Sequence, residues 1–79
     1  MIRYFLLRNS GAQPHALARV DDGAAEQVLP GEAAWSGAPN LYNLAFDVDP
    51  TWVEVDRVGA AAVLAEFGAP ADLLVRPLS

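Results

Sequence analysis

The sequence predicts a single α+β domain over residues 1–79. We expect a small antiparallel sheet of three to four strands, with one main C-terminal helix packed on one face and a short second helix. Three observations lead to this fold class. The chain opens with an apolar run of strand length, an Asp-Gly dipeptide then separates two alternating runs, and a capped, alanine-rich run near the C-terminus has helical spacing.

Residues 2–8 are apolar on both faces of an extended chain, so we expect a central strand there. A hairpin should follow around Asp22-Gly23, because glycine accepts the positive φ that a tight turn requires. The arm before this turn alternates. One face would carry Ala16, Ala18 and Val20, and the other Leu17, Arg19 and Asp21. The arm after the turn alternates in the same way up to Pro30-Gly31.

The middle of the chain is less regular. We expect a loop over residues 32–40, because Gly37 and Pro39 interrupt it. A short helix over residues 40–46, capped by Asn40, would close one end of the sheet. Residues 51–55 alternate and predict a short strand, with its two valines on one face.

The helix predicted most clearly covers residues 56–67. Asp56 is a suitable N-cap, because its carboxylate can accept from free amides of the first turn, and Gly68 is a suitable C-cap. We expect this helix to pack on the sheet through Val58, Ala61, Leu64 and Ala65. The tail after Pro70 would add a short strand or pack across the domain.

The composition excludes several kinds of site. The chain has no cysteine, which rules out disulfides, thiolate metal sites and cysteine nucleophiles. Its net charge of −5 disfavours nucleic acid, whose phosphates repel an acidic surface. No run approaches the roughly 18 apolar residues of a membrane span, and the first apolar run is too short for a signal peptide. We therefore expect a cytoplasmic protein, and the absence of lysine favours a GC-rich bacterial genome.

Residues 44–51, LAFDVDPT, resemble the nucleophile loop of the haloacid dehalogenase superfamily, an apolar strand followed by D-x-D-x-[TV]. The resemblance implies that Asp47 attacks phosphate, Asp49 acts as general acid and base, and Thr51 binds phosphate beside Mg²⁺. However, too few residues follow Thr51 for the family's βα crossovers, each about 30 residues or more. The chain also has no lysine to offset the phosphate charge. We therefore expect an acidic turn here.

The same segment is the basis of an alternative function, a small ligand- or divalent-cation-binding protein or a minimal enzyme. An EF-hand loop beginning at Asp47 would need glycine and glutamate where the chain has Trp52 and Val58. A looser cation site would use the carboxylates of the segment. These are Asp47, Asp49, Glu54 and Asp56.

The candidate partner-binding residues are Trp35, Tyr42 and Trp52. Tryptophan buries much apolar area at low entropic cost and is enriched in interface hot spots. The alternation of residues 51–55 places Trp52 away from the main apolar face of its strand. If the three side chains lay close together, they would form an exposed patch. The alternative is that both tryptophans cover the thin core of a small domain.

These observations favour a non-catalytic protein–protein interaction module, such as a small accessory, immunity-type or regulatory bacterial protein. The sequence shows no evident catalytic cluster, and its single histidine, His15, should lie in a loop or at a strand edge. We expect no catalytic residue, no metal and no cofactor. The partner would be another protein or a second copy of the chain, bound through a free sheet edge or a tryptophan patch, and not nucleic acid or a membrane.

Overall fold

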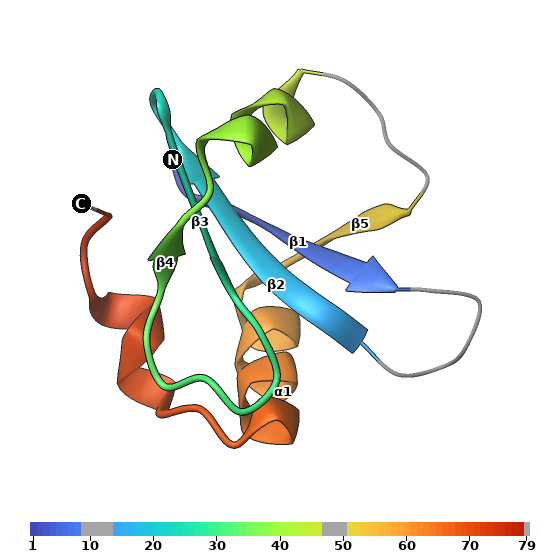
Figure 1. The fold of residues 1–79 in the computed structure, drawn as a ribbon, viewed down its shortest axis with the longest axis vertical. Coiled ribbons are helices and arrows are strands. Elements are labelled where there is room, and N and C mark those ends of the chain that lie inside the picture. The colour runs from blue at the N-terminus through green and yellow to red at the C-terminus, as the bar shows by residue number, and fades with distance from the viewer. Residues whose placement is uncertain (9–13, 47–50, 79) are drawn as a thin grey trace.

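The structure is a computed structural model that describes residues 1–8, 14–46 and 51–78. Within these residues five antiparallel strands form one sheet in the order β4-β3-β2-β1-β5 (Figure 1). The strands are β1 (Arg3–Arg8), β2 (Pro14–Asp21), β3 (Ala24–Val28), β4 (Ser36–Gly37) and β5 (Trp52–Val55). The helices are α1 (Arg57–Phe67) and the 3-10 helices η1 (Pro39–Ala45) and η2 (Ala71–Val75). The α+β class and the antiparallel sheet are therefore confirmed.

The number of strands differs from the prediction of three to four. Residues 36–37, which we predicted as loop, pair with β3 as the short strand β4. Ala38 continues this pairing by donating its amide to the carbonyl of Ala25 at 2.9 Å. A strand of two residues has no periodicity in the sequence, so the tertiary pairing with β3 alone defines it.

The β2–β3 hairpin forms in the predicted place. Asp22 and Gly23 have φ values of 27° and 84°, so both turn residues adopt positive φ. A two-residue turn determines which residues face each other across the hairpin. It places Arg19 opposite Glu26 and Leu17 opposite Val28. β1 lies between β2 and β5, which is the central position that its apolar faces predict.

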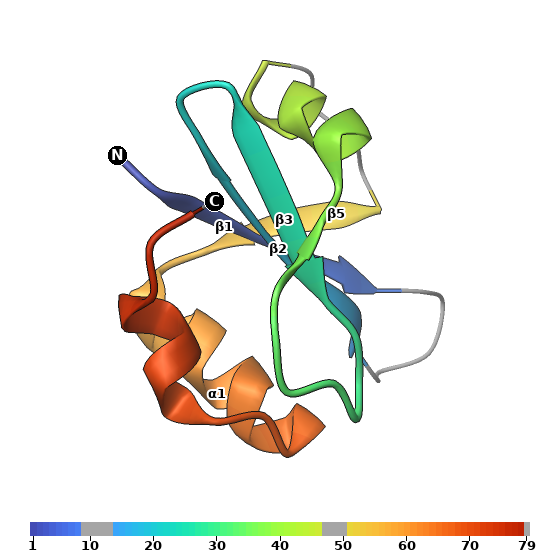
Figure 2. The same cartoon turned by 60° about the vertical axis from the view of Figure 1, so that its left-hand side comes forward.

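Each face of the sheet has its own helical cover (Figures 1 and 2). α1 and η2 cover one face, which we call the α1 side. The core there consists of Tyr4, Leu6, Leu17, Val28, Ala60, Val63, Leu64, Phe67, Leu73 and Leu74. η1 covers the opposite face, which we call the η1 side, where the core consists of Phe5, Ala18, Val20 and Ala25. The alternation along β1 and β2 supplies both cores.

The structure corrects the predicted place and start of η1 and decides between the two alternatives for the C-terminal tail. η1 does not close an end of the sheet but packs on its second face. It begins after Ala38 rather than Asn40, with Pro39 in its first turn and no side-chain cap. The tail after Pro70 forms η2 and buries two leucines on the α1 side, so it packs across the domain and adds no strand. The second apolar face of the sheet explains the position of η1, because that face must also be covered.

The caps of α1 are confirmed, but a different stripe of the helix faces the core. The Asp56 carboxylate accepts from the Gly59 amide at 2.7 Å, and Gly68 ends the helix with a φ of 74°. The buried residues are Ala60, Val63, Leu64 and Phe67. Of the predicted stripe only Leu64 is buried, and Val58 is 79% exposed. The observed stripe has i, i+3, i+4, i+7 spacing and also buries a phenylalanine, which removes more apolar area from water.

Candidate interaction edge

The three predicted partner-binding residues lie on two sides of the sheet. Trp35 packs against the core of the α1 side, whereas Tyr42 and Trp52 pack against the core of the η1 side. All three side chains are partly buried. They therefore do not form one patch, and partner binding by each of them stays a prediction.

Trp35 is part of a buried polar network on the α1 side. Arg19 and Glu26 form an ion pair at 2.6 Å, with side chains only 1% and 8% exposed. The Arg19 guanidinium lies 4.3 Å from the centre of the Trp35 ring, and Trp35 Nε1 donates to the Leu73 carbonyl at 2.8 Å. Arg19 also donates to the backbone carbonyls of Leu73, Arg76 and Pro77. This network fastens the C-terminal segment to the sheet.

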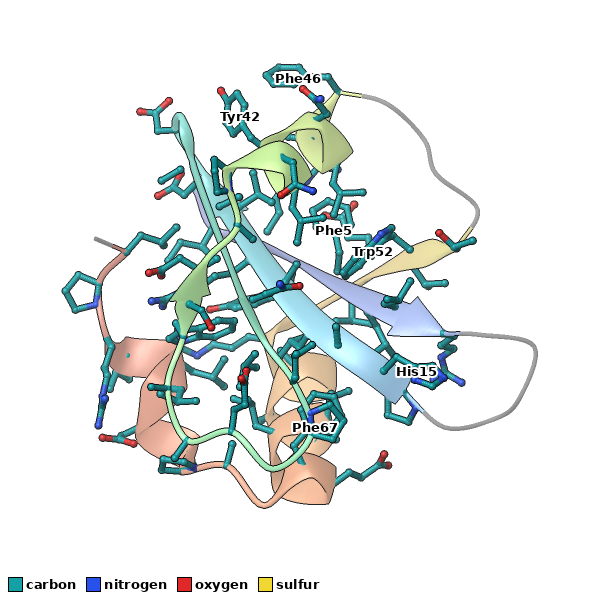
Figure 3. The ribbon with its side chains drawn as sticks, viewed as in Figure 1. Phe5, His15, Tyr42, Phe46, Trp52 and Phe67 are labelled. Carbon is teal, nitrogen blue, oxygen red and sulfur yellow. The ribbon has the colours of Figure 1, made fainter. Side chains whose placement is uncertain are left out.

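The aromatic residues of the η1 side are arranged in two layers. Trp52 lies beside Phe5 between the sheet and η1, while Phe46 lies on the outer side of η1 next to Tyr42, which also contacts the margin of this core (Figure 3). Tyr42 and Phe46 form the predicted i, i+4 aromatic pair, with ring centres 5.2 Å apart. Trp52 thus belongs to the inner layer, and its strand, β5, is the last strand of the described sheet on that side.

β5 is the longer of the two strands that end the described sheet. It pairs with β1 on one side, and no described strand pairs with its other side. The opposite edge strand, β4, has only two residues and runs directly into Ala38 and Pro39. Very short edge strands resist further pairing, and β5, with four residues, is twice the length of β4.

Along β5, the backbone N–H and C=O groups of successive residues point alternately toward β1 and away from the sheet. The amide of Arg8 donates to the carbonyl of Thr51 at 3.2 Å, so Thr51 faces β1. Hydrogen-bonded pairs alternate along an antiparallel ladder, and therefore Val53 and Val55 also direct their polar groups at β1. The N–H and C=O groups of Trp52 and Glu54 then point outward, where they can bind an added strand.

An ion pair holds β5 and η1 together. Arg3 Nε and NH2 donate to the two carboxylate oxygens of Glu54 at 2.9 and 2.8 Å. Arg3 NH1 donates at 3.1 Å to the carbonyl of Ala45, which is the last residue of η1. The hydrogen bonds from Arg3 hold the pKa of the Glu54 carboxyl below its usual value. Glu54 is therefore a charged residue of the edge whose charge is already compensated.

The side chain of Val53 is 47% exposed on the α1 side of the edge. Sequence reasoning assigned the face of Val53 correctly but did not name Val53 or Arg3 as site residues, and it named Glu54 only for the alternative cation site. Their importance depends on β5 being an edge strand, and no local pattern in the sequence shows where a strand lies within a sheet. The alternating, β-branched pattern of residues 51–55 was the only available signal.

A groove of about 480 Å³ lies at the end of β5, lined by residues 1–4 and 54–57. Most of its charged groups already have partners. The N-terminal amine lies 3.0 Å from the Asp21 carboxylate, Arg3 pairs with Glu54, and Asp56 caps α1. Because these groups are already engaged, the groove lacks the convergent free polar groups that typify a small-molecule site.

The acidic segment of the alternative function is only partly described. Asp47 and Asp49 lie outside the described residues. The other two carboxylates have partners: Glu54 pairs with Arg3, and Asp56 accepts from the amide of Gly59. Among the described residues, no three histidine, aspartate or glutamate side chains gather closely enough to hold a metal ion. The cation-binding alternative stays a prediction.

Comparisons with protein-family models, curated proteins and solved structures find no match to this chain. The geometry of the edge is therefore the basis for a functional proposal. In the described part of the chain, no helix has both the length and the apolarity needed to cross a membrane.

Proposed function

We propose that this protein is a non-catalytic protein–protein interaction module that binds its partner along the outer edge of β5. The supporting observation is that no described strand pairs with the outer edge of β5, a strand of four residues along which the alternation of the ladder directs the backbone groups of Trp52 and Glu54 outward. Strand addition to such an edge is a common mode of recognition, in which main-chain hydrogen bonds supply affinity and alternate side chains supply specificity. An accessory, immunity-type or regulatory role in a bacterial cytoplasm is part of the same proposal.

The side chains along β5 suit this mode of binding. Val53 offers exposed apolar surface on the α1 side. On the η1 side, Trp52 lies beside the compensated pair of Arg3 and Glu54. An added strand would thus meet little uncompensated charge, which would otherwise have to be desolvated.

Capture experiments with matched baits test the proposal. Val53→Lys places a charge on the edge, which natural sheets use to prevent strand addition. Val75→Lys is the matched control, because Val75 is an exposed valine of η2. Tagged wild-type, Val53→Lys and Val75→Lys proteins are incubated with a lysate of the source organism that also contains untagged wild-type chain. We expect wild type and Val75→Lys to retain a stoichiometric protein that Val53→Lys loses, and the complex should re-form from purified components.

Two results would contradict the proposal. One is equal retention of the same protein by all three baits, which would place the interface elsewhere. The other is that no bait retains any stoichiometric protein, the untagged chain included. Circular dichroism of the three baits must first show the same fold.

A further inference from the structure

We infer that the partner of the β5 edge is a second copy of this chain, joined antiparallel about a two-fold axis that passes between the two Val53 residues. The inference rests on the proposed function and names its partner. Two identical strands can always pair antiparallel through a two-fold axis, so the same surface serves both copies. The question is whether β5 has a register in which it complements itself.

The backbone permits only a few registers. Trp52 and Glu54 carry the outward-pointing backbone N–H and C=O groups. A hydrogen-bonded pair across the two copies must therefore join Trp52 or Glu54 of one copy to Trp52 or Glu54 of the other. The symmetric choices are Trp52 opposite Trp52, Glu54 opposite Glu54, or Trp52 opposite Glu54. In the third choice Val53 lies opposite Val53.

The chemistry of the side chains selects among these registers. The register with Glu54 opposite Glu54 sets two carboxylates against each other, which is destabilising. The register with Trp52 opposite Trp52 leaves Glu54 and Val55 without partners in the described strand. The remaining register pairs all residues from Thr51 to Val55. It contains two hydrogen-bonded pairs of Trp52 with Glu54, each of which exchanges two backbone hydrogen bonds.

This register also covers the exposed side chains of the edge. The two Val53 residues form a non-hydrogen-bonded pair, in which opposing side chains approach most closely, and each covers the exposed surface of the other. On the η1 side, each Trp52 lies beside the Arg3–Glu54 pair of the other copy. The two copies would share one continuous sheet, with both α1 helices on the same side.

The charge around the edge does not oppose the pairing, although the whole chain carries −5. Next to the edge, Arg3 compensates Glu54, and Asp56 is followed by Arg57. Local charges of opposite sign limit the repulsion between two copies, and salt screens what remains. Four backbone hydrogen bonds and a small apolar contact make a small interface, so we expect a weak dimer that forms at high concentration.

Sedimentation of the purified wild-type protein, up to about millimolar concentration, tests for this dimer. We expect the mean mass to rise toward twice the 8.4 kDa of one chain. Val53→Lys should weaken the dimer by about tenfold or more, because it sets two like charges directly opposite each other. Val75→Lys, which adds the same charge away from the edge, should leave the dissociation constant unchanged.

Cysteine cross-linking tests the register, and the natural absence of cysteine makes the assay clean. In the inferred register the two Val53 Cα atoms lie within the range that a disulfide can bridge. Under mild oxidation, Val53→Cys should therefore form a covalent dimer rapidly. Glu54→Cys, which reports the rejected register, and Val75→Cys should cross-link only at the slow rate of random encounters.

The outcomes separate this inference from the proposed function. A wild-type protein that stays monomeric at millimolar concentration overturns the inference, whereas the proposed function stands if the bait experiment recovers a different protein. A dimer that Val53→Lys does not weaken also overturns the inference, and it overturns the proposed function when the bait experiment finds no other protein that Val53→Lys loses. Faster cross-linking of Glu54→Cys than of Val53→Cys overturns the register.

Discussion

Arg19 joins three parts of the molecule that are distant in the sequence. It lies on β2, pairs with Glu26 on β3 and donates to carbonyls in and after η2. Its guanidinium also lies on the ring of Trp35. A guanidinium has five donors in a planar fork, so it can bind a carboxylate and several carbonyls at once. At the scale of single residues, this side chain determines where the C-terminal segment rests.

Removing one member of the buried pair should be costly. Arg19→Met leaves a buried carboxylate without its counter-charge, and Glu26→Gln does the same to a buried guanidinium, so we expect each to cost about 3–5 kcal/mol in the free energy of unfolding. The double variant Arg19→Met/Glu26→Leu should recover part of the loss, because neither charge remains. Urea denaturation measures all three. Single variants that cost less than about 1 kcal/mol would show that the pair contributes little.

Glu54 should make stability depend on pH. Its pKa in the folded protein is lowered by the hydrogen bonds from Arg3. The unfolded chain, with a glutamate pKa near 4.3, therefore takes up the proton first as the pH falls. The stabilisation is complete above about pH 4.3 and is lost as the pH falls through the lower folded-state pKa.

Thermal denaturation of wild type and Glu54→Gln at pH 7 and pH 3 checks this expectation. The difference in stability between the two proteins should be larger at pH 7. In an Arg3→Gln background the same substitution should no longer change the pH dependence, since the ion pair is absent. A difference that is equal at both pH values in the wild-type background would rule out a contribution from the pair.

At the scale of secondary-structure elements, α1 shows how a helix rich in alanine leaves its orientation open. Several stripes of its sequence are apolar, and the sheet contacts the one that carries Val63, Leu64 and Phe67. Gly59 has a role in the first turn. A Cβ at that position would lie 3.1 Å from Val55 Cβ, so the glycine allows α1 to start close to β5.

The orientation of α1 predicts opposite effects for two substitutions. Phe67→Ala should cost about 3–5 kcal/mol, because it opens a cavity in the core of the α1 side. Val58→Ser should change stability by no more than about 0.5 kcal/mol, since Val58 is exposed. Chemical denaturation of both variants measures the difference. A larger loss for Val58→Ser would mean that the helix faces the core through the stripe expected from sequence alone.

At the scale of the whole molecule, the sheet is a thin layer with a separate core on each face. Such a small domain buries a modest share of its surface, so every covering element contributes to stability. η2 supplies Leu73 and Leu74 to the core, and the segment after it supplies carbonyls to Arg19. The C-terminal segment is therefore part of the folded unit.

Truncation after Ala69 tests this dependence. It removes two buried leucines and uncovers the buried ion pair of Arg19 and Glu26. We expect cooperative folding to be lost. The amide proton signals in the NMR spectrum should then fall in the narrow chemical-shift range of an unfolded chain. Truncation after Leu78, which removes none of these contacts, is the control. A folded protein after the longer truncation would contradict the assigned role of the segment.

Local sequence patterns determined the elements themselves. Residues 2–8 and 51–55 alternate or run apolar as strands do, Asp22-Gly23 specifies a hairpin turn, and Asp56 and Gly68 delimit a helix. Even the pairing of Arg19 with Glu26 follows from that turn, because two turn residues define the register. These features depend on neighbours a few residues away, which a sequence displays directly.

Only the tertiary structure decided which surfaces remain free. It placed β5 at the edge of the sheet, η1 on the second face, Val58 outside the core, and Trp35 on the opposite side from Trp52. The candidate partner-binding residues could therefore be named from sequence, whereas the edge formed by Trp52, Val53 and Glu54 could not. β5 is an edge because no other described strand pairs with its outer side, and that depends on the packing of the chain rather than on any local segment.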